Sequence, residues 1–288
     1  MRILILGGDG MLGHQLLTYL QPNHEVCVTL RRALSNYAEF EIFNGHNSFD
    51  QVELPCLERL TAVLNDFQPQ VLINAVGIIK QRDAAKAVIP SIEVNALLPH
   101  RLNEWCLAKG IRFIHFSTDC VFSGELGNYK EDDFADARDL YGRTKFLGEV
   151  VNGHCITLRT SIIGLELSRK KSLIEWFLSQ EGEVKGFTKA IFSGLTTLEI
   201  CRVVEKILVQ PQLSGLYQVS AESVSKYSLL KTLCEKLGKN IRIVPDGGFI
   251  CDRSLCSEKF KSDAGWVSPS WDRMLTELAA QIKLRDKA

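Results

Sequence analysis

The chain has 288 residues, 45% of them hydrophobic and 24% charged, which is ordinary for a globular protein able to bury a full core. There are 34 basic residues (Lys and Arg) and 34 acidic ones (Asp and Glu), so the formal net charge is zero. This balance does not indicate binding to nucleic acid or to a membrane surface. No apolar run is long enough to span a bilayer, and the nine cysteines show neither a CxxC pair nor zinc-like spacing. We therefore expect a cytoplasmic protein with reduced thiols and no metal site.

Strand and helix patterns alternate through the first half of the chain. The predicted strands are short runs rich in Val, Ile and Leu, at 2–6, 25–30, 70–77, 111–117 and 155–161. Between them, apolar residues recur at helical spacing, at 11–20, 56–67, 92–110 and 139–152. This alternation predicts an α/β fold, a Rossmann-type doubly wound parallel sheet with helices on both faces.

Beyond about residue 160 the alternation becomes irregular. Helical patterns occur at 172–179, 197–210, 226–238 and 270–282, and short strand patterns at 183–187, 215–220 and 241–245. We predict a Rossmann domain over 1–160. Residues 161–288 are expected to form mainly a smaller C-terminal lobe, with some elements returning to the first domain.

A glycine-rich turn, "LGGDGMLGH", joins the first predicted strand to the first helix. Gly7, Gly10 and Gly13 fit GxxGxxG, with Met11 and Leu12 opening the helix. Glycines allow a tight turn and close approach of backbone N–H groups to a pyrophosphate, which then faces the helix N-terminus. The position of the turn between a strand and a helix indicates a dinucleotide site.

The end of the second predicted strand bears on the choice of cofactor. An acidic residue there would bind the ribose 2′-hydroxyl of NAD, but the sequence has Arg31 and Arg32. Two guanidiniums suit a 2′-phosphate and leave NAD without that hydroxyl acceptor, although a solvated arginine pair is the alternative. We predict NADPH as the cofactor, with NADH as the second choice.

The stretch "YGRTK" places Tyr141 and Lys145 four residues apart on one helix face. A free tyrosine, with a pKa of about 10, is a poor acid near neutrality, and a neighbouring ammonium lowers that value. Thr118, in "STDCVFSG", follows a predicted strand at its carboxyl end, where open α/β sheets bind ligands. Its hydroxyl and Tyr141 could hydrogen-bond the same carbonyl oxygen while hydride reaches the carbon.

Taken in order, these motifs resemble the extended short-chain dehydrogenase/reductases, and most closely the dTDP-4-dehydrorhamnose reductase family. The segments "STDCVFSG", "YGRTKFLGE", "LRTSIIG" and "GLYQVS" have counterparts there in the same order. The resemblance implies a catalytic triad of Thr118, Tyr141 and Lys145, with Tyr141 and Lys145 also contacting the cofactor. It further implies that Asn74, Ala75 and Gly77 line the cofactor groove.

For the substrate, the resemblance implies a nucleotide-sugar held by the C-terminal lobe and by Thr118, Asp119, Cys120 and Arg253. The family usually has an aromatic residue at the position of Cys120 and an acid at that of Ser123, so the sugar is left open. In related GDP-fucose synthases a cysteine at this place works with a later histidine in epimerisation. No histidine follows His154 here, so lining a small pocket is the favoured role for Cys120.

The expected function is NADPH-dependent reduction of a UDP- or dTDP-linked 4-keto-6-deoxy sugar in polysaccharide precursor synthesis. One alternative is a bifunctional epimerase/reductase, and another is a non-catalytic NADP-binding regulatory subunit, since the family resembles the regulatory subunit of methionine adenosyltransferase. We also expect a homodimer. Further basic candidates for the diphosphate are Arg159, the Lys185–Lys189 region and the run 169–171, for which a solvated surface is the alternative.

Overall fold

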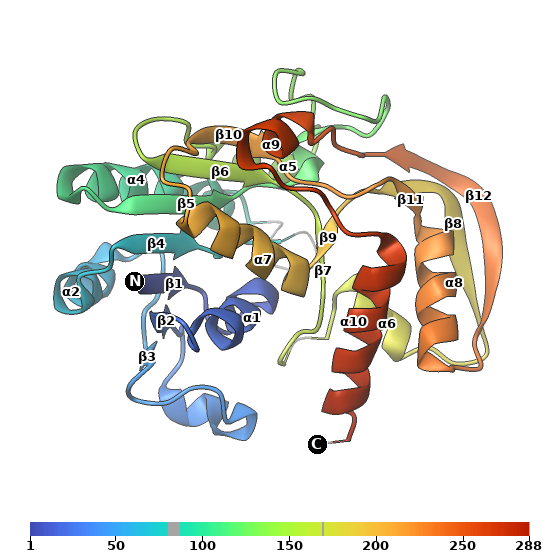
Figure 1. The fold of residues 1–288 in the computed structure, drawn as a ribbon, viewed down its shortest axis with the longest axis horizontal. Coiled ribbons are helices and arrows are strands. Elements are labelled where there is room, and N and C mark those ends of the chain that lie inside the picture. The colour runs from blue at the N-terminus through green and yellow to red at the C-terminus, as the bar shows by residue number, and fades with distance from the viewer. Residues whose placement is uncertain (80–86, 169, 288) are drawn as a thin grey trace. The chain divides into compact units, whose positions relative to one another are not determined.

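The computed structural model describes residues 1–79, 87–168 and 170–287 (Figure 1). The chain forms two compact units. Unit 1 comprises Met1–Ser117, Arg138–Leu158 and Val204–Leu216, and unit 2 comprises Thr118–Ala137, Arg159–Val203 and Tyr217–Ala288. Within the described residues, no helix has the length and apolarity that a bilayer crossing requires.

A seven-stranded sheet has the order β10-β6-β5-β4-β1-β2-β3. Its strands are β1 (Arg2–Leu6), β2 (Glu25–Thr29), β3 (Ser48–Phe49), β4 (Val71–Asn74), β5 (Arg112–Phe116), β6 (Cys155–Arg159) and β10 (Gly215–Gln218). Neighbouring strands from β3 through to β6 pair in parallel, and the strand order reverses between β1 and β4. This arrangement confirms the predicted Rossmann-type sheet. In open α/β sheets of this kind, ligands generally bind beyond the carboxyl ends of the strands, where the strand order reverses.

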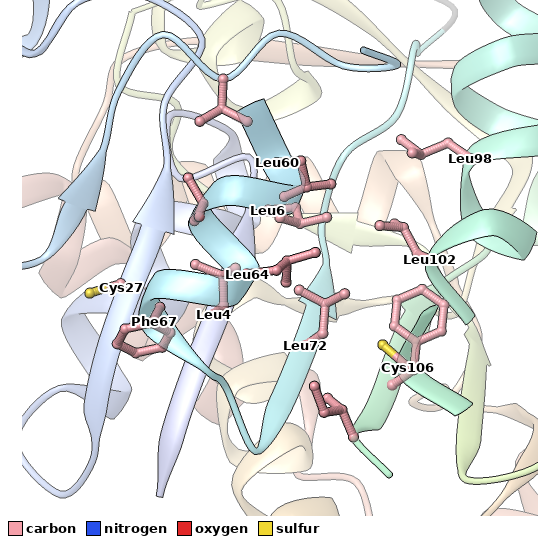
Figure 2. Packing of buried hydrophobic residues seen from close by; sticks show 14 of the residues in the cluster. Leu4, Leu6, Cys27, Leu60, Leu64, Phe67, Leu72, Leu98, Leu102 and Cys106 are labelled. Carbon is pink, nitrogen blue, oxygen red and sulfur yellow. The ribbon is translucent and has the colours of Figure 1, made fainter. Parts of the chain in front are cut away.

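Helices cover both faces of this sheet within unit 1. α2 (Leu57–Phe67) and α4 (Leu98–Lys109) pack on one face, where leucines of β1, β4 and both helices form a buried cluster (Figure 2). α1 (Met11–Leu20) lies against β1 and β2 on the opposite side from α2 (Figure 1). The strands are therefore buried on both faces, which explains their nearly continuous apolar sequences.

The helix predicted over 92–110 begins earlier, at Val88, and the helical stretch consists of three segments. α3 (Val88–Ser91) leads into the π-helical segment η3 (Ile92–Leu97), and α4 follows. Pro99 has no N–H for the carbonyl of Asn95, four residues earlier, so the helix widens there. The helix predicted over 139–152 is shorter, α5 (Leu140–Leu147), and ends at Gly148. A Cβ on Gly148 would collide with the Asn95 carbonyl, so only glycine allows this close approach.

Unit 2 contains a three-stranded sheet of order β11-β8-β12, formed by β8 (Glu183–Phe192), β11 (Val224–Ser225) and β12 (Arg242–Asp252). Its core also includes side chains from α6 (Leu173–Leu178), α8 (Lys226–Leu237) and α10 (Trp271–Arg285). The remaining elements are η1 (Leu34–Phe40), η4 (Asp119–Val121), β7 (Ile162–Ile163), β9 (Leu195–Thr196), α7 (Thr197–Leu208) and α9 (Glu258–Ala264).

The strand predicted over 241–245 extends further than its sequence indicates. β12 continues through the turn-like "DGG" segment at 246–248 because it pairs with β8, and the register shifts between Asp246 and Ile250. Pairing with a strand some sixty residues away therefore overrides the local turn preference of Asp and Gly.

Candidate functional site

The glycine-rich turn is folded tightly after β1. Gly7 has φ of 85°, a conformation that glycine adopts without strain, and its N–H donates to Thr29 Oγ1 at 3.1 Å. Gly8 N donates to the carbonyl of Thr29 at 2.9 Å, and Gly10 N donates to the carbonyl of Gly7 at 3.0 Å. The two bonds to Thr29 attach the turn to the end of β2, and the third closes the turn on itself.

The N-terminus of α1 is suited to an anion. Gly10 is the N-cap residue and has no side chain with which to cap α1, and within the described residues the first turn from Met11 onward contains no acid. A Cβ on Gly13 would collide with the carbonyl of Gly7, so the helix can approach the turn this closely only with glycine at that position. Uncapped N–H groups beside a glycine turn fit the pyrophosphate of a dinucleotide.

The end of β2 carries two exposed arginines, Arg31 and Arg32. The backbone there is braced on two sides. Arg32 N donates to the Tyr37 hydroxyl at 3.3 Å, and the Arg32 carbonyl accepts from Gln51 N at 3.3 Å. The loop is therefore ordered while both guanidiniums remain exposed, which fits recognition of a charged group.

Asn74, Ala75 and Gly77 lie at the carboxyl end of β4, beside the same turn. The buried Asn74 side chain accepts from Val76 N at 3.1 Å through Oδ1 and donates through Nδ2 to His115 Nδ1 at 3.2 Å. Ala75 N donates to the carbonyl of Leu6 at 3.2 Å. The Asn74 side chain thus shapes its own loop after β4, and both ends of its amide are engaged within the fold.

Sequence reasoning missed Asn95, which holds this loop in place. Its buried side chain accepts from Ile78 N at 2.8 Å and donates to the Ile78 carbonyl at 3.0 Å. The same Nδ2 donates to Thr144 Oγ1 on α5 at 3.3 Å. An asparagine within an apolar helical run is a weak sequence signal, and only the fold gives it these partners.

Lys145 and Tyr141 lie on α5, whose N-terminus is capped by Asp139 accepting from Gly142 N at 3.0 Å. The Lys145 side chain is buried, and its Nζ donates to the carbonyl of Phe116 at 2.6 Å. The Lys145 ammonium therefore lies at the carboxyl end of β5. Its partner Phe116 is two residues before Thr118 along the chain. Tyr141 is half-buried one helical turn earlier.

Burial lowers the pKa of Lys145 to about 8, and the negative charge of Glu149 opposes this change. Glu149 also accepts a hydrogen bond of 2.6 Å from the Ser117 hydroxyl. At neutral pH Lys145 is therefore mainly cationic, and a cation one turn from a tyrosine lowers the cost of forming its phenolate.

In unit 2, the residues after β5 bring together Thr118, Asp119 and Cys120. The Thr118 hydroxyl donates to Asp119 Oδ1 at 3.0 Å and accepts from Cys120 N at 3.1 Å, so it caps η4. Burial raises the pKa of Asp119, while its bond from Thr118 and the charge of Arg253 act in the opposite direction.

Arg253 joins this group from the position directly after β12. Its Nη1 donates to Cys120 Sγ at 3.8 Å, its Nε to the carbonyl of Phe122 at 2.8 Å and its Nη2 to the carbonyl of Ser123 at 3.2 Å. The structure thus brings together all four residues predicted to bind substrate. Ser123 itself donates through Oγ to Asp136 Oδ2 at 2.6 Å, so a carboxylate lies beside the position where the family usually has an acid.

The other basic candidates differ in their surroundings. Arg159 is buried, donates to the carbonyl of Glu131 at 3.0 Å and lies over the Phe122 ring, so it has partners within the fold. Lys185 is exposed and pairs with Asp246 at 3.2 Å, and Lys189 is exposed. Arg169 lies outside the described residues. In the described part of the chain, no group of three or more His, Cys, Asp or Glu side chains could hold a metal ion.

Comparison with known proteins gives the family. The model of the RmlD substrate binding domain family matches residues 1–246. The chain belongs to this family. A relative named dTDP-4-dehydrorhamnose reductase, from Aggregatibacter actinomycetemcomitans, is 26% identical over 262 residues, covering 84% of this chain and 83% of that protein. Methionine adenosyltransferase 2 subunit beta from Bos taurus is 25% identical over 252 residues, covering 79% of this chain and 70% of that one.

Among solved structures, a dTDP-4-dehydrorhamnose reductase from Bacillus anthracis in complex with NADP has a TM-score of 0.80 at 20% identity. The match covers 97% of this chain and 99% of that one. This similarity confirms the fold class, and the RmlD substrate binding domain family confirms the resemblance inferred from the motifs. The reductases related to this chain support the expected class, an NAD(P)H-dependent oxidoreductase. The roles of individual residues remain predictions.

Proposed function

We propose that this protein is an NADPH-dependent reductase of the C4 keto group of a nucleotide-diphosphate-linked 4-keto-6-deoxy sugar, acting in polysaccharide precursor synthesis. The observation that carries the proposal is the buried Lys145 ammonium, held on the Phe116 carbonyl one helical turn from Tyr141. Burial disfavours the charged form of Lys145 and lowers its pKa to about 8. Strongly perturbed pKa values cluster at functional sites, so this lysine beside a tyrosine supports a catalytic role.

The cofactor would be held by unit 1. Uncapped N–H groups of α1 would receive the pyrophosphate, and Arg31 and Arg32 would receive the 2′-phosphate. The bound NADPH supplies the hydride that reduces the ketone carbon. Both NADPH and NADH are candidates for this groove, with NADPH preferred because of the two guanidiniums.

In the proposed reaction, Tyr141 donates its phenolic proton to the ketone oxygen as the carbon gains hydride, so the product is the 4-hydroxy sugar. Lys145 stabilises the phenolate that remains on Tyr141 until a proton returns from solvent. Thr118 hydrogen-bonds the same oxygen after its hydroxyl turns away from Asp119. Arg253 supports Cys120 and the backbone at 122–123, where we expect the sugar to bind.

A panel of dTDP-, UDP- and GDP-linked 4-keto sugars, assayed by the loss of NADPH absorbance, tests the proposal. We expect turnover with a dTDP- or UDP-linked sugar, with a modest preference for UDP-linked amino sugars because Cys120 and Ser123 are small. The variant Tyr141→Phe serves as the matched control, which should bind NADPH and turn over poorly. Turnover of no sugar in the panel would overturn the reductase proposal.

Two other functions have a specific observation in their favour. The contact of 3.8 Å from Arg253 to Cys120 Sγ would stabilise a thiolate, which favours epimerisation before reduction. Solvent deuterium at ring carbons C3 or C5 of the product would reveal that activity. The relative named as a subunit of methionine adenosyltransferase favours a regulatory subunit that binds NADP without turnover. NADPH binding without reduction of any keto sugar would support it.

A homodimer is the expected assembly, and an apolar face of unit 1 supports it. Val88 and Ile89 of α3 and Leu147 of α5 are exposed, and α3 contacts α5, so these side chains belong to neighbouring helices. Ile89 is 70% exposed and Leu147 60%, and apolar side chains that are exposed on adjacent helices can form an interface. Sedimentation should show a dimer that Leu147→Glu dissociates, while Leu284→Glu on α10, at 73% exposure, leaves it intact. A monomeric wild type would contradict this expectation.

A further inference from the structure

Asp9 lies in the middle of the glycine-rich turn, between Gly8 and Gly10, and its carboxylate is directed toward the end of β2. Its Oδ2 accepts from the Tyr37 hydroxyl at 3.2 Å. The same hydroxyl accepts from Arg32 N at 3.3 Å. The carboxylate is therefore two hydrogen bonds from the backbone of the arginine pair, although the two segments are more than twenty residues apart in sequence.

Tyr37 is well placed to fix this carboxylate. The tyrosine is buried in η1, where its ring packs edge-on against Phe43 with 5.6 Å between ring centroids. Burial and the negative charge of Asp9 raise the pKa of Tyr37, whereas the charge of Arg31 lowers it. The neutral phenol thus lies within reach of both charges and can serve as a rigid spacer between them.

In this fold the ribose 2′-position is recognised at the end of the second strand, by an acid for a hydroxyl or by arginine for a phosphate. The chain has no acid at the end of β2 itself, and the fold brings one there from the glycine-rich turn. We propose that Asp9, positioned by Tyr37, is a specificity-determining residue that accepts the ribose 2′-hydroxyl of NADH and weakens the preference for NADPH.

The arginine pair and the Asp9 carboxylate then have opposite effects on the choice of cofactor. Arg31 and Arg32 attract a 2′-phosphate, whereas the Asp9 carboxylate repels it and offers a 2′-hydroxyl the acceptor it needs. The chain accordingly accepts both cofactors, and the ratio of their affinities depends on Asp9. The inference rests on the proposed cofactor site and requires no particular sugar substrate.

The test measures dissociation constants of NADPH and NADH by fluorescence titration without any sugar. Asp9→Asn should weaken NADH roughly tenfold, the loss of one charge-assisted hydrogen bond, and leave NADPH unchanged or tighter. Tyr37→Phe, which keeps the ring packing, should shift the ratio in the same direction by a smaller factor. Asp66→Asn, an exposed site on α2 with the same change of charge, should leave both constants unaltered.

Equal losses for both cofactors in Asp9→Asn, with an unchanged melting temperature, would mean that Asp9 only braces the turn, and would overturn the inference. Dissociation constants that both stay at the wild-type values would also overturn it. Either result leaves the proposed reductase intact, because wild-type turnover is measured separately. Conversely, a shifted ratio in a protein that reduces no sugar upholds the inference and removes the proposed reaction. Binding of neither cofactor to wild type would overturn both.

Discussion

Replacing Lys145 by Met should stabilise the cofactor-free protein near neutral pH while impairing its activity. The Lys145 pKa falls from 10.5 to about 8 on folding, chiefly because of burial. Each tenfold change in proton affinity corresponds to 1.36 kcal/mol, so keeping Lys145 charged in the fold costs about 3 kcal/mol at pH 7. The side chain is only 4% exposed, so solvent screening does not reduce this figure much.

The pH dependence follows from the direction of this change. Because the folded pKa lies below the unfolded one, the cost is fully present below pH 8 and disappears as the pH rises from about 8 toward 10.5. Lys145→Met removes this cost but leaves the Phe116 carbonyl without its donor, a loss of about 1–3 kcal/mol. The variant should therefore be more stable than wild type by about 1 kcal/mol at pH 7 and less stable near pH 10.

Urea unfolding of wild type and Lys145→Met, followed by circular dichroism from pH 7 to 10, measures this difference. The free energy of unfolding of the variant relative to wild type should fall by about 2–3 kcal/mol over that range. Lys287→Met, which removes an exposed lysine, controls for loss of charge and should show no such trend. A flat difference for Lys145→Met would refute the reasoning that burial perturbs this ammonium. In parallel, the variant should bind NADPH more weakly.

Three other changes test separate parts of the site. Tyr141→Phe should retain NADPH binding and lower kcat by roughly 10²–10⁴, and near-wild-type turnover in a stopped assay would dismiss Tyr141 as the acid. Replacing Arg31 and Arg32 together by Ala should weaken NADPH much more than NADH, by about 1.5–3 kcal/mol for each charge-assisted bond lost; titrations showing equal losses would contradict the 2′-phosphate assignment. Asn95→Ala leaves the backbone N–H and C=O of Ile78 without their hydrogen-bond partner, which should lower the free energy of unfolding in urea by about 2–4 kcal/mol. An unchanged midpoint would show that this brace is dispensable.

The geometry of the glycine-rich turn could be predicted from sequence because it is local. The glycine-rich turn, the strand before it and the helix after it are contiguous in sequence. Gly7 has a φ of 85°, a conformation that favours glycine, so the residue type itself indicates the turn. The pairing of Tyr141 with Lys145 is equally local, since four residues span one helical turn. The apolar runs of the strands predicted the parallel sheet because buried strands require apolar side chains on both faces.

Only the tertiary structure decided which distant groups meet. Asn95, Ile78 and Thr144 come from separate segments, and no local pattern predicts that one amide joins all three. Likewise, β12 runs through a segment that reads as a turn because its partner β8 supplies the hydrogen bonds. The sequence by itself determined where Asp9 and the arginine pair stand along the chain. That Asp9 reaches the end of β2 was decided by the fold, because the pairing of β1 with β2 and the buried Tyr37 bring the two segments within hydrogen-bonding distance.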